Sequence, residues 1–416
     1  MRLDPRDNDL LAGAGGEGAA LAMRVLVATA RLLAAPELTD ISSAHIDGCL
    51  YHGESGVLFA EKLVADGAKV RVPTTLNVGA LDLVHTGRER ISTETRDLAR
   101  RMMSAYVAMG CKPTWTCAPY QAGHRPAAGQ DVAWGESNAV VFCNSVLGAR
   151  TNRYGDFLDI CAAVTGRVPR TGLHLPSQRL ATILIDTTQV PRAFFDQDIA
   201  YAIVGAWLGR EVGSDIAAFG GLGEPTEDQL KALGAAAASS GAVALFHIIG
   251  VTPEAANQHI AFGGLAPKRT IHLDMQMLHQ ARESLSTVNL PVGSDIDAVA
   301  IGSPHLSAAE LRHVDRLLKD RRCRVPLYAC TGRHALAEIA REGIDSALAD
   351  RGVVLIADTC IVVTPILPSN GGVLVTNSGK FAHYTPANTG YDVMLANLEE
   401  CIDSAVAGRL QLRPPT

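Results

Sequence analysis

Apolar and polar residues alternate along this 416-residue chain with two different spacings. Where apolar residues recur every three or four positions, a helix is expected. Helices are predicted in this way at residues 17–36, 57–68, 95–110, 133–149, 155–166 and 198–213. Short apolar runs rich in β-branched residues predict strands instead. These runs lie at residues 69–72, 171–175, 181–186, 215–219, 241–250, 269–273, 297–305, 325–332, 352–360 and 372–379.

The regular alternation of strands and helices after Ser214 is typical of parallel sheets covered by helices. A chain of 416 residues is too long for one ordinary core, so we expect several α/β lobes. Abundant Gly and Ala, with only 5% aromatic residues, suit close packing of strands against helices. We place a lobe boundary just after Pro191, between an N-terminal α/β lobe at 1–195 and a C-terminal lobe or lobes at 196–416.

The stretch from Pro113 to Asp156 contains more reactive side chains than any other window of the chain. They are Cys117, His124, Glu136, Asn138, Cys143, Asn144, Arg150, Asn152 and Arg153. The helix predicted at 133–149 places Glu136 and Asn138 near its first turn. A capped, partly buried helix is the alternative interpretation, but capping requires one or two such residues rather than nine. We therefore favour a functional site.

Two earlier loops offer further polar groups. The first loop lies between a short strand and a helix, which is a common place for a ligand in α/β proteins. It contains His45, Asp47, His52 and Glu54. Surface histidines and a helix cap explain it equally well. The second loop follows the strand at 69–72 and offers Thr74, Thr75 and Asn77 as hydrogen-bonding residues.

Five predicted strands of the C-terminal half carry polar residues just past a buried apolar run. These are His247 with Thr252, Ser303 with His305, Cys330 with Thr331 and Arg333, Asp358 with Cys360, and Asn377 with Ser378 and Lys380. Ligands of open parallel sheets bind outside the carboxyl ends of the strands. Five such endings in series predict a shared cleft.

The nine cysteines are odd in number, widely scattered and without any C-x-x-C pair, which argues against a disulfide framework and against the common zinc spacings. Most of them are expected to pack as small apolar residues. Cys117, Cys330 and Cys360 differ, because each lies at a strand end or in a loop beside small or hydroxylated neighbours. Three thiolates that meet from separate loops would hold an iron-sulfur cluster with one iron open to substrate.

Charge and hydropathy exclude several classes of partner. A formal net charge of −6 without any Lys/Arg run makes nucleic acid and acidic membranes poor partners. No apolar run reaches the length of a membrane span. The first residues carry acidic groups and no apolar core, so no secretory signal is expected, and a cytoplasmic location is predicted.

Eight long segments carry a resemblance to a known family. They are HIDGCLYHGESG, VPTTLNVGALDL, TCAPYQAGHRP, WGESNAVVFCNSVLGARTNRYGD, LFHIIGVTPEA, GSPHLSAAEL, ADTCIVVTPI and TNSGKFAHY. In these segments, from about Asp9 to Arg409, the chain closely resembles the catalytic (large) part of aconitase X enzymes. The resemblance implies an aconitase-like fold, in which several three-layer α/β lobes with mostly parallel sheets surround a central cleft.

The resemblance also implies an activity, that of a hydro-lyase with an iron-sulfur cluster as Lewis acid. Cys117, Cys330 and Cys360 match the expected iron ligands, with the cluster type (2Fe-2S, 3Fe-4S or 4Fe-4S) left open. Similar enzymes dehydrate cis-3-hydroxy-L-proline or mevalonate 5-phosphate. Such enzymes usually carry a small swivelling domain, fused or as a separate subunit. This domain is not found in the chain, so a catalytic group would come from a small subunit in trans.

The roles of individual residues follow from the chemistry of dehydration. A carbanion beside a carboxylate would be stabilised by Arg150, Arg153 and Lys380. For proton transfer, His52, Lys380 and Glu136 are all candidates. The residues predicted to bind substrate are Thr74, Thr75, Asn77, Asn138, Asn144, Arg150, Asn152, Arg153 and Ser378. The three cations also suit salt bridges between lobes, which is the structural alternative.

Two rival functions remain open from the sequence. One is a lyase with a single metal ion, or without a cluster, that uses His52, His124 and Cys117. The other is a regulatory or non-catalytic subunit that requires a small partner chain.

Overall fold

The computed structural model describes residues 1–368 and 371–413, and it divides into two compact units. Unit 1 comprises Met1–Leu81, Ile91–Leu180 and Thr252–Glu254. Unit 2 comprises Asp82–Arg90, Ala181–Val251 and Ala255–Thr416. The chain thus changes unit between Leu180 and Ala181, whereas the sequence placed a lobe boundary at residue 195.

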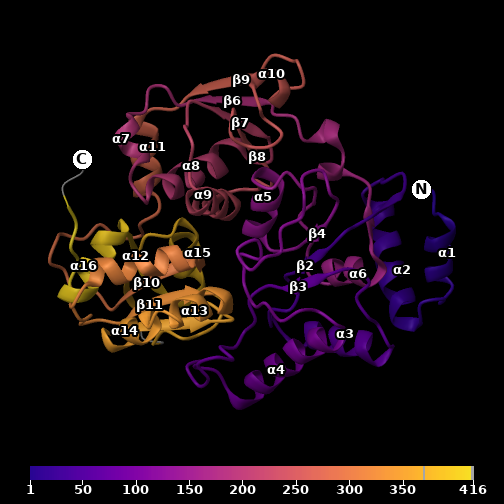
Figure 1. Ribbon diagram of the computed structural model, residues 1–416, viewed down its shortest axis with the longest axis horizontal. Coiled ribbons are helices and arrows are strands. Elements are labelled where there is room, and N and C mark those ends of the chain that lie inside the picture. Colours follow the sequence, from indigo (N-terminus) through magenta and orange to yellow (C-terminus); the bar gives the residue numbers. More distant parts are fainter. Residues whose placement is uncertain (369–370, 414–416) are drawn as a thin grey trace. The chain divides into compact units, whose positions relative to one another are not determined.

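Unit 1 is built on a small parallel sheet with the strand order β3-β2-β4. Its strands are β1 (Leu38–Asp40), β2 (Ala44–Ile46), β3 (Thr74–Leu76), β4 (Ala133–Trp134) and β5 (Arg167–Pro169). Its helices are α1 (Pro5–Leu11), α2 (Glu17–Leu32), α3 (Glu54–Ala65), α4 (Thr93–Ala108), α5 (Ser137–Ser145), α6 (Leu158–Thr165) and the 3-10 turns η1 (Gly172–His174) and η2 (Pro176–Gln178). Strands β1 and β5 form a separate antiparallel pair, and α2 packs on α6 (Figure 1).

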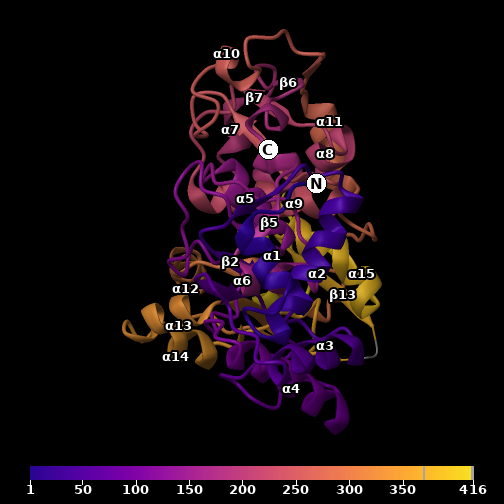
Figure 2. The same ribbon diagram turned by 90° about the vertical axis from the view of Figure 1, so that its right-hand side faces the viewer.

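Unit 2 contains two parallel sheets. The first has the order β8-β7-β6-β9. It consists of β6 (Ile183–Asp186), β7 (Ala217–Gly220), β8 (Phe246–Ile248) and β9 (Arg269–His272), with helices α7 (Arg192–Phe195), α8 (Ala200–Val212), α9 (Glu227–Ser240), α10 (Gln258–Ala261) and α11 (Met275–Glu283). Helix α8 packs against both α9 and α11, so these three helices form one layer (Figure 2).

The second sheet of unit 2 has the order β12-β11-β10-β13-β14, with every pair parallel. Its strands are β10 (Ala298–Leu306), β11 (Leu327–Thr331), β12 (Val353–Ala357), β13 (Gly372–Thr376) and β14 (Tyr391–Leu395). Its helices are α12 (Ala308–Leu318), α13 (Arg333–Ala340), α14 (Ile344–Asp350), α15 (Gly379–Thr389) and α16 (Leu398–Ala407). The α/β fold class with mostly parallel sheets is confirmed.

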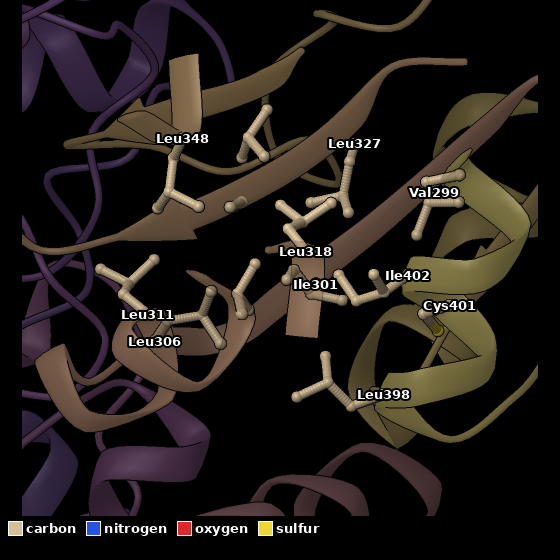
Figure 3. Packing of buried hydrophobic residues seen from close by; sticks show 14 of the residues in the cluster. Val299, Ile301, Leu306, Leu311, Leu318, Leu327, Leu348, Leu398, Cys401 and Ile402 are labelled. Carbon is tan, nitrogen blue, oxygen red and sulfur yellow. The ribbon is translucent and has the colours of Figure 1, made fainter. Parts of the chain in front are cut away.

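Alternation along the strands separates the two faces of this second sheet. Val299 and Ile301 of β10 pack with apolar residues of α12, α13, α14 and α16, as the cluster in Figure 3 shows. The intervening residues Ala298 and Ala300 face the opposite side, where Phe381 of α15 and the segment Cys360–Leu367 cover the sheet. The sheet is therefore buried on both faces, as a parallel sheet requires.

Two predicted strands differ from the structure. Residues 171–175 were predicted as a strand, but they form the 3-10 turn η1. The reason is Asn152, whose amide donates to Thr171 O (2.9 Å) and accepts from Leu173 N (2.8 Å), so a side chain replaces a strand partner. The second difference is that residues 69–72, which were predicted as a strand, form none, and β3 instead begins at Thr74 and contains Thr75.

Candidate active site

Three strands of unit 1 end side by side, and two of them are followed directly by a polar residue and the third by a glycine. Asp47 follows β2, Asn77 follows β3, and Gly135 follows β4. The amide of Asn77 donates to Asp47 Oδ1. A Cβ atom on Gly135 would lie 2.9 Å from Asp47 Cβ, so only glycine lets the end of β4 approach β2 so closely. Because the strand order reverses at β2, this edge is a topological switch point, where ligands of α/β sheets bind.

Asp159 fixes the first of these strand ends. Its carboxylate accepts hydrogen bonds from the amides of Asp47 (2.7 Å) and Gly48 (3.0 Å). Burial raises the pKa of Asp159 to about 7. The sequence analysis did not identify this residue, although an acidic group in the apolar helix LDICAAVT is an indication that was present.

A chain of hydrogen bonds runs through the same sheet. Thr75 Oγ1 lies 2.9 Å from His45 Nδ1 and 2.7 Å from His124 Nδ1, and His124 Nε2 lies 2.8 Å from Ser43 Oγ. His45 Nε2 is buried and has no hydrogen-bond partner within the described residues. Burial lowers the pKa of both histidines, that of His124 to about 4, so both rings are neutral near pH 7. Thr75, predicted to bind substrate, thus links two imidazoles.

Neutral His124 makes the stability of the protein dependent on pH. Its pKa is lower in the folded chain than the ordinary 6.5, so protonation favours unfolding, and stability present above about pH 6.5 is lost as the pH falls. From about pH 7 to about pH 5, His124 alone should cost about 2 kcal/mol of unfolding free energy. Urea titrations at the two pH values should show that His124→Gln loses less unfolding free energy than the wild type, by about that amount. The exposed His279→Gln should lose as much as the wild type. Equal pH slopes for all three proteins would contradict the prediction.

Helix α5 begins after Glu136 and places Asn138 beside Cys117. Glu136 caps the helix, since its Oε2 accepts from Ala139 N at 2.6 Å, as the capping interpretation predicted. Asn138 Nδ2 donates to the carbonyl of Cys117 at 3.0 Å. Asn138 Oδ1 is buried and accepts no hydrogen bond within the described part of the chain. Asn138 therefore anchors the Cys117 loop and keeps an acceptor for another group.

The remaining predicted residues of unit 1 have different environments. Asn144 is engaged on both sides of its amide, by the backbone of Thr151 and by Arg179 Nη1 at 2.9 Å. Arg150 is half-buried, and its Nε has no hydrogen-bond partner in residues 1–368 and 371–413. Arg153 and His52 are exposed. Thr74 Oγ1 donates to Val72 O at 2.8 Å. Asn144, Asn152 and Thr74 thus have visible structural roles.

In unit 2, a pocket lies where β10 and β13 end. Strands β11 and β12 extend from one side of β10, and β13 and β14 from the other, so this is the switch point of the second sheet. The pocket is lined by Ala202, Lys231, Ala232, Gly302, Ser303, Pro304, Leu306, Glu310, Asn377, Ser378, Gly379 and Lys380. Ser378 caps α15, with its Oγ accepting from Phe381 N at 3.0 Å. The structure thus brings Ser378 and Lys380 together at a helix N-terminus, where anions bind.

Lys231 is a buried cation beside this pocket that the sequence analysis missed. Its side chain is 2% exposed. The ammonium group pairs with Asp228 Oδ1 (2.8 Å) and with Glu310, and it donates to the carbonyl of His305 (3.2 Å). These contacts join α9 to the end of β10. Its position in the Ala-rich helix sequence EDQLKALGAAAASS resembles that of a surface lysine, so the pattern gave no indication of burial.

Cys330 and Cys360 lie on one face of the second sheet. Cys330 is the fourth residue of β11, and alternation directs it to the face that Cys360 and the following segment cover. A Cβ atom on Gly302 would lie 2.2 Å from the Cys330 carbonyl oxygen, so glycine is required there. Cys117 is buried in unit 1. A thiol on β11 and a thiol in the segment after the neighbouring strand β12 fit a soft metal centre in kind. Among the described residues, however, no group of three His, Cys, Asp or Glu side chains is placed to hold a metal ion.

Helix length and composition also bear on the class of protein. In the part of the chain that the structure covers, none of the helices combines the length and the apolar character that a bilayer span needs.

The chain matches three family models that together cover most of its length. They are described as Aconitase X first domain (residues 1–177), second domain (residues 181–283) and third domain (residues 296–407). The chain is also similar to a solved structure, the holo-form of aconitase X from Thermococcus kodakaraensis. The TM-score is 0.86, with 33% identity over 97% of this chain and 100% of the other.

Three similar proteins are each named as a dehydratase or as a subunit of one. The chain is 42% identical to a cis-3-hydroxy-L-proline dehydratase of Pseudomonas aeruginosa, over 98% of this chain and 70% of the relative. It is 38% identical to a protein of the same name from Hypocrea jecorina, over 100% and 70%. It is 37% identical to the phosphomevalonate dehydratase large subunit of Methanothermobacter thermautotrophicus, over 94% and 96%. Identity along the whole chain to these hydro-lyases, with matches to the first, second and third domains in order, shows that the chain belongs to the aconitase X family.

Proposed function

We propose that this hydro-lyase removes water from cis-3-hydroxy-L-proline or a cyclic hydroxy acid of similar size. The observation that carries the proposal is the 42% identity over 98% of the chain to a dehydratase named for that acid. The pocket of unit 2 supports it, because a helix N-terminus, a hydroxyl and an ammonium group meet there and suit a carboxylate.

The reaction breaks two bonds of the substrate. A base takes the proton from the carbon next to the carboxylate, and the hydroxyl on the neighbouring carbon accepts a proton from an acid and leaves as water. A double bond forms between the two carbons, and the ring nitrogen then allows the enamine to become a cyclic imine. When bound, an iron-sulfur cluster supplies a Lewis acid that makes hydroxide a better leaving group. We propose Cys117, Cys330 and Cys360 as its ligands.

The residues of the chain would act mainly on the carboxylate. When the proton leaves, the carbon next to the carboxylate keeps the electron pair, and the substrate gains negative charge. Lys380 and the first amides of α15 would stabilise this charge. Ser378 orients this helix end by capping it. Within unit 1, Asn138 Oδ1, Asn77 Oδ1 and Arg150 Nε are buried polar atoms without hydrogen-bond partners among the described residues, and we propose that they bind polar groups of the substrate.

Proton transfer has three proposed residues with unequal support. Glu136 Oε2 accepts a hydrogen bond from the amide of Ala139 in the first turn of α5, which fixes its orientation. His52 is exposed in the loop before α3. Lys380 lines the pocket of unit 2. We propose Lys380 for the carboxylate and His52 for proton transfer, with a group of a small partner subunit as the alternative.

A substrate panel tests the proposal. Anaerobically purified protein, reconstituted with iron and sulfide, would be incubated with cis-3-hydroxy-L-proline, its trans isomer and mevalonate 5-phosphate. In D₂O, mass spectrometry should show loss of one water from the cis acid and one solvent deuterium on the carbon that carried the hydroxyl, because the enamine is protonated there as it becomes the imine. Turnover of mevalonate 5-phosphate alone would favour the second candidate, because the N-terminus of α15 with Lys380 also suits a phosphate. Inactivity relieved only by a small partner chain would favour the subunit interpretation.

Lys380 itself can be tested by substitution. Lys380→Met should lower kcat/KM about 100-fold, because a preorganised charge that stabilises an anionic transition state is lost. Lys380→Arg should recover part of that loss. The exposed Lys268→Met serves as the control and should match the wild type. An unchanged kcat/KM in Lys380→Met would remove this residue from the mechanism.

A further inference from the structure

The residue that follows β12 has an unusual backbone. Asp358 has a φ of 62°, in the left-handed region, and its side chain is fully buried. Few residues other than glycine adopt this conformation, although aspartate tolerates it better than most. Such a conformation persists where neighbouring groups enforce it, and it occurs often at functional sites. Cys360 lies only two residues further along the chain.

Arg333 is the group that holds Asp358. Its Nε and Nη2 atoms each lie 2.6 Å from one oxygen of the Asp358 carboxylate, which is the two-pronged geometry of a strong ion pair. Arg333 is the first residue of α13 and comes three residues after Cys330. The ion pair therefore joins the segment just after Cys330 to the segment just before Cys360.

The two strands are in register up to this ion pair. Strands β11 and β12 are neighbours, and Thr331 pairs with Ala357 at their carboxyl ends. The pairing between the two strands stops at that pair, so the sheet does not fix the positions of the segments that follow the strands. The Arg333–Asp358 ion pair takes over where the ladder ends, on the same edge of the sheet as both thiols.

Two more contacts fix the backbone on either side of Asp358. Asp82 accepts a hydrogen bond from Ala357 N at 3.1 Å. The carbonyl of Thr359 accepts from His305 Nε2 at 3.1 Å. The carbonyl of Cys360 in turn accepts from the amides of Val363 and Thr364. The segment that leads to Cys360 is thus held by β10, by α13 and by the loop 82–90.

We propose that Arg333 and Asp358 are positioning residues, which hold the segments of Cys330 and Cys360 at a fixed spacing before any metal binds. The proposal rests on the proposed function, in which these thiols bind iron. Groups outside the ligand set that orient the ligands commonly change metal affinity by about 10- to 100-fold when they are removed. The ion pair would act in this way through the backbone rather than by touching the metal.

The test uses two variants that keep the fold as far as possible. Asp358→Asn retains a side chain that tolerates the left-handed region but removes the charge. Arg333→Lys retains the charge but removes the planar fork. The matched control is Arg312→Lys, because Arg312 makes a similar fork to Glu342, two residues after the end of α13, at the surface. Each full-length protein would be prepared without metal and titrated anaerobically with Co²⁺, whose thiolate absorption band reports sulfur ligation.

We expect both variants to bind Co²⁺ at least about 10-fold more weakly than the wild type and to lose a reconstituted cluster to a chelator at least about 10-fold faster. The melting temperature of the metal-free variants should stay close to that of Arg312→Lys. A merely structural role would instead lower the melting temperature without a specific loss of metal affinity. Wild-type affinity and cluster lifetime in both variants would overturn the positioning role alone. A wild-type protein that shows no thiolate band and retains no iron would overturn the proposed cofactor, and the positioning role with it.

Discussion

Serine in place of Cys330, Cys360 or Cys117 is expected to abolish both the brown colour of the reconstituted protein and its dehydratase activity. A hydroxyl is a hard, weakly acidic donor that does not replace a thiolate toward iron, so the cluster should be lost rather than altered. Iron and sulfide analysis after anaerobic reconstitution measures this directly, alongside product formation from the hydroxy acid. The expected residual activity is below detection in each of the three variants.

Cys401→Ser supplies the matched control. Cys401 is fully buried in α16, within the apolar cluster on the other face of the second sheet (Figure 3). Burying a hydroxyl there should cost about 1–3 kcal/mol of stability, but iron should be retained. Full colour and activity in all three of the first variants would reject the ligand assignment, whereas loss in Cys401→Ser as well would point to general unfolding.

The largest effect on stability is expected for Arg179→Met. The Arg179 side chain is 2% exposed, and it pairs with Glu254 while donating to the carbonyls of Asn144, Ala149 and Leu173. Removing the cation leaves a carboxylate and three carbonyl oxygens without their donor, which should lower the unfolding free energy by about 3–5 kcal/mol. Urea denaturation followed by circular dichroism would measure the change.

The exposed pair of Arg101 and Glu61 provides the comparison. It has the same two-pronged geometry, but half of the Arg101 side chain is exposed. Arg101→Met should therefore cost only about 0–1 kcal/mol. If Arg179→Met were no more destabilising than Arg101→Met, burial would not be the factor that makes the first ion pair important.

The strands of unit 2 could be predicted from the sequence because they are local patterns. Runs such as AVAIGSPHL and VVLIA are continuous and apolar, as strands buried on both faces must be, and each gave a strand where one was expected. The α/β class followed from their alternation with helices. Strand β14 was not predicted, because the run YDVML is interrupted by an aspartate.

The candidate site was harder to predict from the sequence, because its residues are held by partners that are distant in the sequence. Asn152 and Asn144 were grouped with substrate-binding residues by their proximity to Arg150, yet their amides satisfy the backbone of residues up to 21 positions away. The roles of Asp159 and Lys231 follow only from their contacts with residues that lie 112 and 79 positions away in the sequence. Composition and spacing locate a polar loop, but they do not distinguish a side chain that binds a ligand from one that replaces a hydrogen bond of the sheet.

The row of contacts from Ser43 through His124 and Thr75 to His45 has a consequence for where its protons sit. When the hydroxyl of Thr75 donates within the row, two neutral rings and two hydroxyls permit two arrangements, in which every donor points one way along the row or every donor points the other way. The orphaned Nε2 of His45 distinguishes them, since a buried N–H without an acceptor is rarer than a bare lone pair. The tautomer with hydrogen on Nδ1 of His45 is thus favoured, and the polarity it sets ends on Ser43 as an acceptor, whose own hydrogen is left to point elsewhere.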